Sequence, residues 1–485
     1  MTRLSFVGAM RIALCTALLA ILHGYPAQAQ ISTSTLSKET PDAYFWNNRP
    51  PDPRFKADIL VVVAHPDDED MVVAYLAREI YDHDKRVAVV YENTSPSGND
   101  RESTEQAAAL GDAREIEART AVGSLGISNV WFLGGSNIST QNPLDSLEEG
   151  GNGRMLDQLV RIVRLTRPSV ILTWLPDSTT GENHGDHQAS GILATEAFDL
   201  AGNPTVFPEQ VSPALHPNVA GNMTEALHPW QPEKIYYFYN PTYDIFKGQG
   251  PQYSSEDISP SQHVSYGLLG AKDASKHWTQ GKTRQLAAEL AVAIANHNVA
   301  LSGGEGEWLM HPVKFIFGKS LVPSGVTDDV FTGVVPEGIP YQRPPGYVAV
   351  KYSEPTLLIG DPWAFYKNFW QAHGIDHLAT LVPAEISVHT DGVLYIPLII
   401  ENPLDRAIDV SLSVQAPDGW KLRPLLTPLS VPAHAEYFAD VEADAPSAKL
   451  PGWQNFAVTG ASGNKSLGTV PFRLELSNGW VAPQW

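Results

Sequence analysis

The sequence has almost no cysteine. Its 485 residues include one, Cys15, which lies in an N-terminal segment with the features of a secretion signal. Removal of that segment would leave a mature chain without cysteine. We therefore expect the mature protein to have no disulfide bond, no thiolate nucleophile and no cysteine-ligated metal.

The N-terminal apolar run is too short to be a membrane anchor. It follows Arg3 and Arg11 and covers residues 12–22, whereas a membrane span needs ~20 apolar residues. Ala27-Gln28-Ala29 then provides a small-x-small cleavage site. We expect a signal peptide over residues 1–29, an exported protein in the periplasm or outside the cell, and no membrane span after cleavage.

Basic residues are few relative to acidic ones. There are 33 Lys and Arg against 54 Asp and Glu, which gives a formal net charge of -21. This charge repels phosphate backbones and no long basic run interrupts it, so we expect no nucleic-acid partner. A solvated acidic surface accounts for the charge. Because hydrophobic residues make up 43% of the chain, it can bury a sizeable core, which excludes a wholly disordered protein.

Strand-like and helix-like segments alternate in the first part of the chain. Short apolar runs predict buried strands at residues 59–64, 86–91, 129–133 and 170–174. Helical patterns lie between them, at residues 68–81, 103–125 and around 156–163. This alternation predicts an α/β fold with a mostly parallel, Rossmann-like sheet flanked by helices.

The pattern changes towards the C-terminus. A proline-rich stretch at residues 321–355 follows the α/β pattern and predicts a linker. Beyond residue 384, short alternating segments separated by turn residues predict a β-sandwich. The length of the chain also favours two or three domains. The predicted organisation is an α/β domain over residues 30–320, a linker and connecting segment over 321–384, and a β-sandwich over 385–485.

Two polar motifs follow predicted strands. His65-Pro66-Asp67-Asp68-Glu69 comes after the first strand, and His184-Gly185-Asp186-His187 comes after the strand at residues 170–174. Open α/β sheets bind ligands at the carboxyl ends of their strands, so the two motifs can meet there. Histidine and carboxylate side chains bind divalent metals. We expect His65 and Asp68 to converge on one ion, which leaves Asp67 free to act on an attacking water.

A purely structural role is the alternative for these residues. Pro-Asp-Asp-Glu places acidic side chains at the positive end of a helix, where Asp67 can act as a cap. A single histidine near the end of a strand is commonly a hydrogen-bonded structural residue. The occurrence of both motifs after separate strands favours the metal site.

The paired motifs resemble the signature of the LmbE-like, or PIG-L, N-deacetylases. Similar stretches lie at residues 114–118, 125–127 and 132–134, and the resemblance covers about residues 55–300. Members of this family remove acetyl groups from N-acetylglucosamine in glycosylphosphatidylinositol precursors, thiol cofactor precursors, chitooligosaccharides and some glycopeptide antibiotics. The resemblance implies a zinc-dependent hydrolase of an acetylated amine, with a small-molecule or oligosaccharide substrate that contains N-acetylglucosamine.

The resemblance also implies roles for the motif residues. The expected zinc ligands are His65, Asp68 and His187. Asp67 is the expected general base, and His184 is expected to stabilise the oxyanion or to protonate the leaving amine. Three residues are expected to support these groups or to contact substrate: Asp186, which would orient a histidine, Glu69 and Arg114.

Some positions leave alternatives open. Gly185 stands where the family usually has proline and is expected to loosen the loop, and the turn at residues 93–100 replaces a glycine-rich turn that shapes the pocket. Arg114 either contacts substrate or forms a helix-surface ion pair with Glu117. His277 either supports the pocket or packs in the core.

One motif in the C-terminal part resembles a known module, and two other functions are alternatives to the deacetylase. Asp418-Gly419-Trp420 resembles NEW3-type, immunoglobulin-like modules of secreted glycosidases, which would act here as a structural spacer or packing domain, or contact carbohydrate. Two histidines and a carboxylate also build the iron(II) oxygenase site, but that site predicts a β-barrel. The second rival is an inactive deacetylase fold that binds carbohydrate, and the intact motifs argue against it.

Overall fold

The computed structural model describes residues 51–178, 183–212, 225–240, 249–281, 283–381, 383–425, 428–447, 451–479, 481–482 and 484. The predicted signal peptide and Cys15 lie outside these residues. Among the described helices, none has the length and apolar character needed to cross a membrane.

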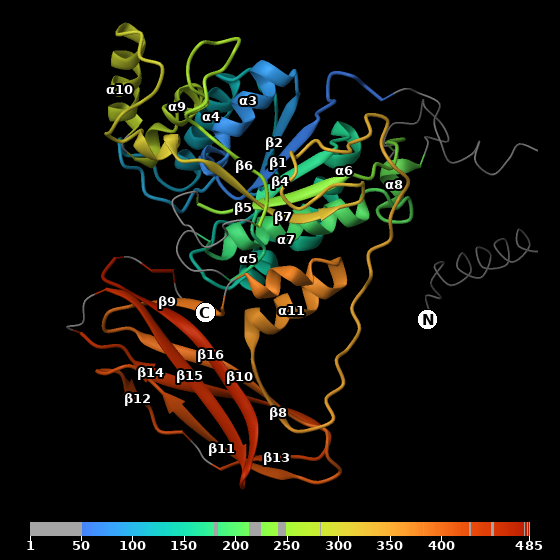
Figure 1. Cartoon of the computed structure of the whole chain (residues 1–485), viewed down its shortest axis with the longest axis vertical. Helices are drawn as coiled ribbons and strands as arrows, with labels where there is room; N and C mark the ends of the chain where they lie inside the picture. The colour runs from blue at the N-terminus through green and yellow to red at the C-terminus, as the bar shows by residue number, and fades with distance from the viewer. Residues whose placement is uncertain are drawn as a thin grey trace, which may run out of the picture. The chain divides into compact units, whose positions relative to one another are not determined.

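A seven-stranded sheet forms the centre of the α/β part (Figure 1). Its strand order is β3-β2-β1-β4-β5-β7-β6. The first five strands are parallel, whereas β7 is antiparallel to β5 and β6 is antiparallel to β7. The mostly parallel sheet is confirmed, and its 3-2-1-4-5 order is typical of doubly wound folds. The strands are β1 Ile59–Val63, β2 Val87–Tyr91, β3 Asn129–Phe132, β4 Val170–Trp174, β5 Lys234–Phe238, β6 Gln252–Tyr253 and β7 Val313–Ser320.

Helices cover both faces of this sheet. On one face α3, α4, α9 and α10 pack together, and on the other α5, α6 and α7 pack together (Figure 1). The helices are α3 Val73–His83, α4 Ala108–Gly123, α5 Pro143–Gly150, α6 Asn152–Thr166, α7 Gly185–Leu200, α8 Pro208–Val211, α9 Tyr266–Ala274 and α10 Thr283–Ala295. Short 3-10 turns are η1 Asp68–Met71, η2 Trp278–Gln280 and η3 Glu307–Met310.

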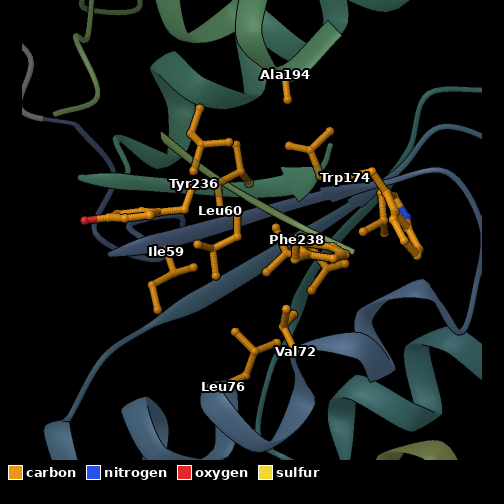
Figure 2. Packing of buried hydrophobic residues seen from close by; sticks show 14 of the residues in the cluster. Ile59, Leu60, Val72, Leu76, Trp174, Ala194, Tyr236 and Phe238 are labelled. Atoms are coloured by element: carbon orange, nitrogen blue, oxygen red, sulfur yellow. The ribbon is translucent and has the colours of Figure 1, made fainter. Parts of the chain in front are cut away.

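The apolar runs of the sequence explain why the central strands are so well anchored. Strands β1, β2, β4 and β5 are buried at every position, as expected for strands covered on both faces. Figure 2 shows Leu60 and Phe238 between Leu76 of α3 and Ala194 of α7. Each fully buried aliphatic side chain contributes roughly 1.5–3 kcal/mol. The strand ends that carry the two motifs are therefore held rigidly.

The observed helices differ from the predicted ones in three places. α4 begins at Ala108 and not near residue 103. After β1 the chain first forms η1, because the side chains of its three acidic residues are buried instead of exposed along a helix. The sequence pattern also does not reveal α7. That helix is buried on nearly all sides, so its sequence has no polar stripe.

Two further sheets follow the α/β part, and we call them the C-terminal β region. Their strand orders are β12-β14-β10-β8 and β13-β11-β15-β16-β9. Neighbouring strands are antiparallel except for β16 and β9. Both sheets contribute to one hydrophobic cluster. The strands are β8 Thr356–Ile359, β9 Glu385–His389, β10 Val393–Asn402, β11 Ile408–Gln415, β12 Lys421–Leu422, β13 Leu429–Val431, β14 Ala435–Asp444, β15 Gly452–Ser462 and β16 Lys465–Ser477.

The connecting segment that follows the predicted linker, up to residue 384, contains regular structure. β8 pairs with β10, and it is followed by α11 Asp361–His373 and the 3-10 turn η4 Asp376–Thr380. α11 packs on α7, and Trp370 Nε1 donates a hydrogen bond to the carbonyl of Pro176 (2.9 Å). The surrounding prolines conceal this short strand and helix in the sequence.

Trp420 is part of the core of the C-terminal β region. Its side chain is buried, its Nε1 donates to Gln454 Oε1 (2.8 Å), and its ring stands edge-on to Phe456 at 5.0 Å. A tryptophan in this position packs the sheets together. Of the two roles considered for this motif, the packing role is the one that the contacts support.

Candidate active site

Two loops bring the motif residues to the carboxyl edge of the central sheet. The first loop leaves β1 and carries His65, Asp67 and Asp68. The second follows β4 and enters α7, where His184 is the N-cap and His187 lies in the first turn. Because β1 and β4 are neighbours in the sheet, loops far apart in the sequence meet at one edge.

Three candidate ligand side chains lie close together. His187 Nε2 is 3.2 Å from His65 Nδ1 and 3.2 Å from Asp68 Oδ1. His65 Nδ1 is 3.8 Å from Asp68 Oδ2. A tetrahedral ion with ligand bonds of ~2.0 Å keeps its ligand atoms about 3.3 Å apart. The three side chains therefore fit a single divalent metal ion.

Asp68 is held as a carboxylate with one oxygen turned towards His187. Its other oxygen, Oδ2, accepts hydrogen bonds from the amides of Ala64 and His65 and from Trp174 Nε1, each at 2.9 Å. Burial alone would raise the pKa of Asp68, but His187 and His65 hold it well below its ordinary value. The side chain thus carries the charge that a cation needs.

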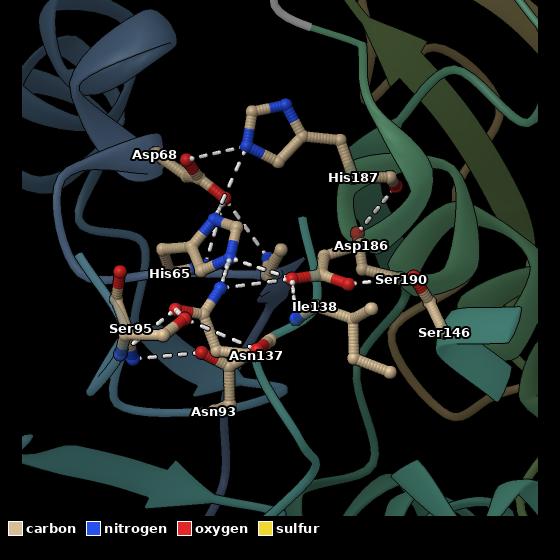
Figure 3. A network of polar contacts seen from close by, with 12 residues as sticks. His65, Asp68, Asn93, Ser95, Asn137, Ile138, Ser146, Asp186, His187 and Ser190 are labelled. Atoms are coloured by element: carbon tan, nitrogen blue, oxygen red, sulfur yellow. Dashed lines mark hydrogen bonds and ion pairs between the residues drawn. The ribbon is translucent and has the colours of Figure 1, made fainter. Parts of the chain in front are cut away.

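The two candidate ligand histidines are oriented by neighbouring side chains (Figure 3). Asp186 Oδ2 lies 3.2 Å from His65 Nε2, and Asp186 Oδ1 accepts a 2.6 Å hydrogen bond from Ser146 Oγ. This pairing favours a proton on His65 Nε2 and leaves the Nδ1 lone pair for a metal. The His187 ring stacks on Trp174, with centroids 4.1 Å apart and planes inclined by 5°. Asp186 lies where the sequence predicts an orienting carboxylate.

Asp67 lines the cavity beside these ligands but is not one of the three. Its φ of 93° is left-handed, a conformation that Asp and Asn adopt more readily than most residues. Its amide donates a hydrogen bond to Glu69 Oε2 (3.1 Å). Burial and the neighbouring Asp68 and Glu69 charges raise the pKa of Asp67 to about 7. A carboxylate with this pKa can accept and return a proton near neutral pH.

His184 faces the same group of ligands. Its ring centroid is 4.1 Å from that of His187 and 5.2 Å from that of His65. Burial, reinforced by His187 and His65, lowers the pKa of His184 well below its ordinary value. The imidazole is therefore neutral at pH 7. A neutral imidazole can donate an N–H hydrogen bond to a developing negative charge.

A buried network behind the first loop fixes Glu69. His277 Nε2 lies 3.1 Å from Glu69 Oε1 and 3.7 Å from Asp273 Oδ2, and Gln280 Nε2 donates to the carbonyl of Pro66 (2.6 Å). Glu69, Asp273 and His277 are close enough to share a metal ion. However, although burial lowers the pKa of His277, the charge of Glu69 and the contact with Asp273 raise it well above its ordinary value. His277 thus lies between two carboxylates, and together with Gln280 it supports the first loop.

Arg114 is buried behind the pocket and holds the turn at residues 93–100. Its Nη1 donates to the carbonyl (2.8 Å) and hydroxyl (2.6 Å) of Ser95, Nη2 to the carbonyl of Asn99 (3.1 Å), and Nε to Thr279 Oγ1 (3.1 Å). The helix-surface position is wrong, because the side chain is 4% exposed. Arg114 is also not among the described residues that line the cavity, so its contact with substrate would be indirect.

Gly185 allows a close approach between two loops. Its amide donates to the carbonyl of Thr140 (2.8 Å), a bond that proline cannot make. A Cβ at this position would lie 2.8 Å from Ser146 Oγ and 2.9 Å from the carbonyl oxygen of Asn142. The start of α7 is thus packed tightly, which is the opposite of the loosening expected from the sequence.

The site opens into a cavity of about 740 Å³. His65, Asp67, Asp68, His184 and His187 all line it, together with residues that sequence reasoning did not assign to the site. Two of these are Trp174, at the end of β4, and Asn137, whose Nδ2 donates to Asp186 Oδ2 (3.0 Å). Trp174 and Asn137 lie at or just beyond the carboxyl ends of β4 and β3, and this position in the sequence could have indicated that they belong to the site.

The comparisons with known proteins agree with this site. Residues 60–198 match the model of the PIG-L family, described as GlcNAc-PI de-N-acetylase. A 1D-myo-inositol 2-acetamido-2-deoxy-alpha-D-glucopyranoside deacetylase 1 of Frankia alni is 26% identical over 311 residues, which cover 56% of this chain and 99% of that protein. The corresponding deacetylase of Thermobifida fusca is 24% identical over 285 residues, covering 53% and 91%.

Among solved structures, the chain aligns with the N,N'-diacetylchitobiose deacetylase of Pyrococcus horikoshii. The identity is 15% and the TM-score 0.36, with 53% of this chain and 83% of that chain covered. The match of residues 60–198 to the family model and the alignment of the two bacterial deacetylases over nearly their whole length lead to one conclusion. The α/β part of the chain contains a PIG-L/LmbE-like deacetylase domain.

Proposed function

We propose that this protein is a zinc-dependent N-deacetylase that removes the acetyl group from a sugar or glycoconjugate containing N-acetylglucosamine. The observation that carries the proposal is the convergence of His65, Asp68 and His187 in one cavity, beside a carboxylate that titrates near pH 7. The family match supports the reaction class, and the named relatives act on an acetamido sugar.

The ligand set suits a catalytic zinc ion. Two imidazoles and one carboxylate are common zinc ligands, and three protein ligands leave a coordination position open for chemistry. When bound, zinc would lower the pKa of an attacking water and polarise the amide carbonyl. The hydrogen bonds that His65 donates to Asp186 and Trp174 donates to Asp68 would keep the ligands oriented.

Asp67 and His184 would carry out the remaining steps. Asp67 takes a proton from the attacking water and returns it to the leaving amine, and a pKa near 7 suits both transfers. Neutral His184 donates a hydrogen bond to the oxyanion of the tetrahedral intermediate. The carbon–nitrogen bond then breaks, releasing acetate and a free amine.

The predicted secretion signal supports a reaction outside the cytoplasm. Residues 1–29 have the charge, apolar run and cleavage site of such a signal, so the protein would act in the periplasm or outside the cell. Export would favour a glycan or an oligosaccharide outside the cytoplasm as the substrate.

Acetate release from a panel of N-acetylated sugars tests the proposal. Purified protein without residues 1–29 is assayed after chelator treatment, with and without added zinc, and its metal content is measured. We expect release that depends on zinc. No release with one zinc bound per chain would contradict a sugar substrate, and no release without bound metal would favour the inactive carbohydrate-binding alternative.

A further inference from the structure

Part of the cavity wall comes from the C-terminal β region. Ser387 on β9 and Glu475 and Ser477 on β16 line the same cavity as His65 and His187. We call Ser387, Glu475 and Ser477 the β wall. Ser387 Oγ donates a hydrogen bond to Glu475 Oε2 (3.0 Å), which fixes the carboxylate within this wall.

The β wall is hydrogen-bonded to the loop beside the ligands. Gln141, in the loop after β3, donates through Nε2 to the carbonyls of Ser387 (3.0 Å) and Ala482 (2.7 Å) and accepts through Oε1 from the Ser387 amide (3.2 Å). Its own carbonyl accepts from Gln188 Nε2 (3.2 Å), and Gln188 directly follows His187. Tyr366 of α11 also donates to Gln188 Oε1 (3.1 Å). The wall is thus positioned relative to the catalytic loops by specific bonds.

The cavity is larger than one sugar requires. An N-acetylglucosamine unit has roughly fifteen non-hydrogen atoms. If each atom took about 30 Å³, the volume of a water molecule in the liquid, the unit would fill about 450 Å³. The cavity measures about 740 Å³. Even by this generous count, space for part of a second unit remains beside the one being deacetylated.

The chemistry of the lining selects against phosphate. Among the described lining residues the carboxyl groups are those of Asp67, Asp68 and Glu475, and none of the described ones is Lys or Arg. Many of the others are serine, asparagine or glutamine. Such a surface exchanges hydrogen bonds with sugar hydroxyls and repels anions.

We propose that the β wall is a distal sugar subsite, which makes an uncharged N-acetylated amino-sugar oligomer the preferred substrate. This inference rests on the proposed deacetylase function. One sugar lies at His65, Asp68 and His187, and the next sugar of the same chain hydrogen-bonds to Ser477 and to the carboxylate of Glu475. Monosaccharides and phosphorylated glycans lack these contacts and react less efficiently.

The experiment compares kcat/KM for acetate release from N-acetylglucosamine and from its β-1,4-linked dimer and trimer, with the zinc-loaded full chain. We expect the oligomers to exceed the monomer by about tenfold, the effect of one hydrogen bond to a charged group. The isosteric change Glu475→Gln should remove most of this ratio, and Ser477→Trp should bring it to about one by filling the subsite. Asp409→Asn, on an exposed position of β11, is the control and should keep the wild-type ratio.

Melting curves show whether each variant is folded. If Ser477→Trp does not fold, the ratio measured for Glu475→Gln tests the subsite on its own. The subsite would be overturned if the wild-type protein showed an oligomer-to-monomer ratio near one. It would also be overturned if a folded Glu475→Gln variant kept the same ratio as the wild type. Faster release from N-acetylglucosamine 6-phosphate than from the uncharged sugar would overturn the charge argument. No release from any sugar is a separate result, because it would overturn the proposed function itself.

Discussion

Replacing Asp67 by asparagine should separate proton transfer from metal binding. Asparagine has nearly the same shape and tolerates the left-handed φ of 93°. The hydrogen bond from the backbone amide of residue 67 to Glu69 Oε2 (3.1 Å) should therefore remain. The side chains of His65, Asp68 and His187 are unchanged. We expect Asp67→Asn to keep its zinc but to lose about 10²–10⁴-fold in kcat, the usual contribution of a general base. That loss corresponds to about 3–5 kcal/mol in activation free energy.

The same change should stabilise the metal-free protein at high pH. The pKa of Asp67 is raised from 3.8 to about 7, with burial as the largest cause. The native state therefore holds this proton more tightly than the unfolded state, and the wild type loses stability as the pH rises from about 4 through 7. The loss is at most about 4 kcal/mol, less what solvent in the cavity screens. Because asparagine does not titrate, the variant should gain no stability over the wild type near pH 4 and should show its full gain near pH 8.

Three measurements check this pair of effects: acetate release, zinc content, and melting curves in chelator at the two pH values. Asp84→Asn is a matched control, because Asp84 is also a left-handed aspartate (φ 54°) but lies exposed at the end of α3. Undiminished turnover in Asp67→Asn would refute the role of Asp67 as base. Loss of zinc from that variant would instead make Asp67 a ligand, and equal melting temperatures at pH 8 would refute the electrostatic reasoning.

Three further substitutions test the surroundings of the site. His187→Ala should lose both zinc and activity, and a wild-type metal content would exclude His187 as a ligand. Trp174→Phe keeps a ring against His187 but removes one of three hydrogen bonds to Asp68 Oδ2; zinc affinity measured by chelator competition should fall about tenfold, unlike in the exposed control Trp453→Phe, and an unchanged affinity would show that this bond does not orient the ligand. Gly185→Ala should lower the unfolding free energy by about 1–3 kcal/mol through overpacking, whereas Gly123→Ala, with open space around it, should not; equal denaturation midpoints would contradict the close approach.

The parallel sheet could be predicted because its strands are continuous apolar runs. The same logic placed both motifs at one edge, since β1 and β4 end there, and the structure brings His65, Asp68 and His187 together. The pattern fails for α7, which is buried on nearly all sides, and β8 and α11 lie next to prolines. Periodicity reports a boundary between core and solvent, and α7 has little of one.

The supporting contacts could not be predicted because they depend on tertiary distance. Nothing in the sequence indicates that Arg114 reaches Ser95, or that His277 holds Glu69 across the loop. Gly185 shows the same limit: a missing side chain suggests freedom, yet here it marks a close approach between two loops. Residue type predicts what a side chain can do, whereas its partners follow from the fold.

The bonds of Gln141 make the two halves of the molecule thermodynamically interdependent. This side chain, with α11 packed on α7, ties the C-terminal sheets to the helix that begins at the ligands. Opening the contact would expose buried polar groups on both sides at once, so separation is disfavoured short of global unfolding. The C-terminal sheets therefore act as part of the scaffold of the catalytic loops.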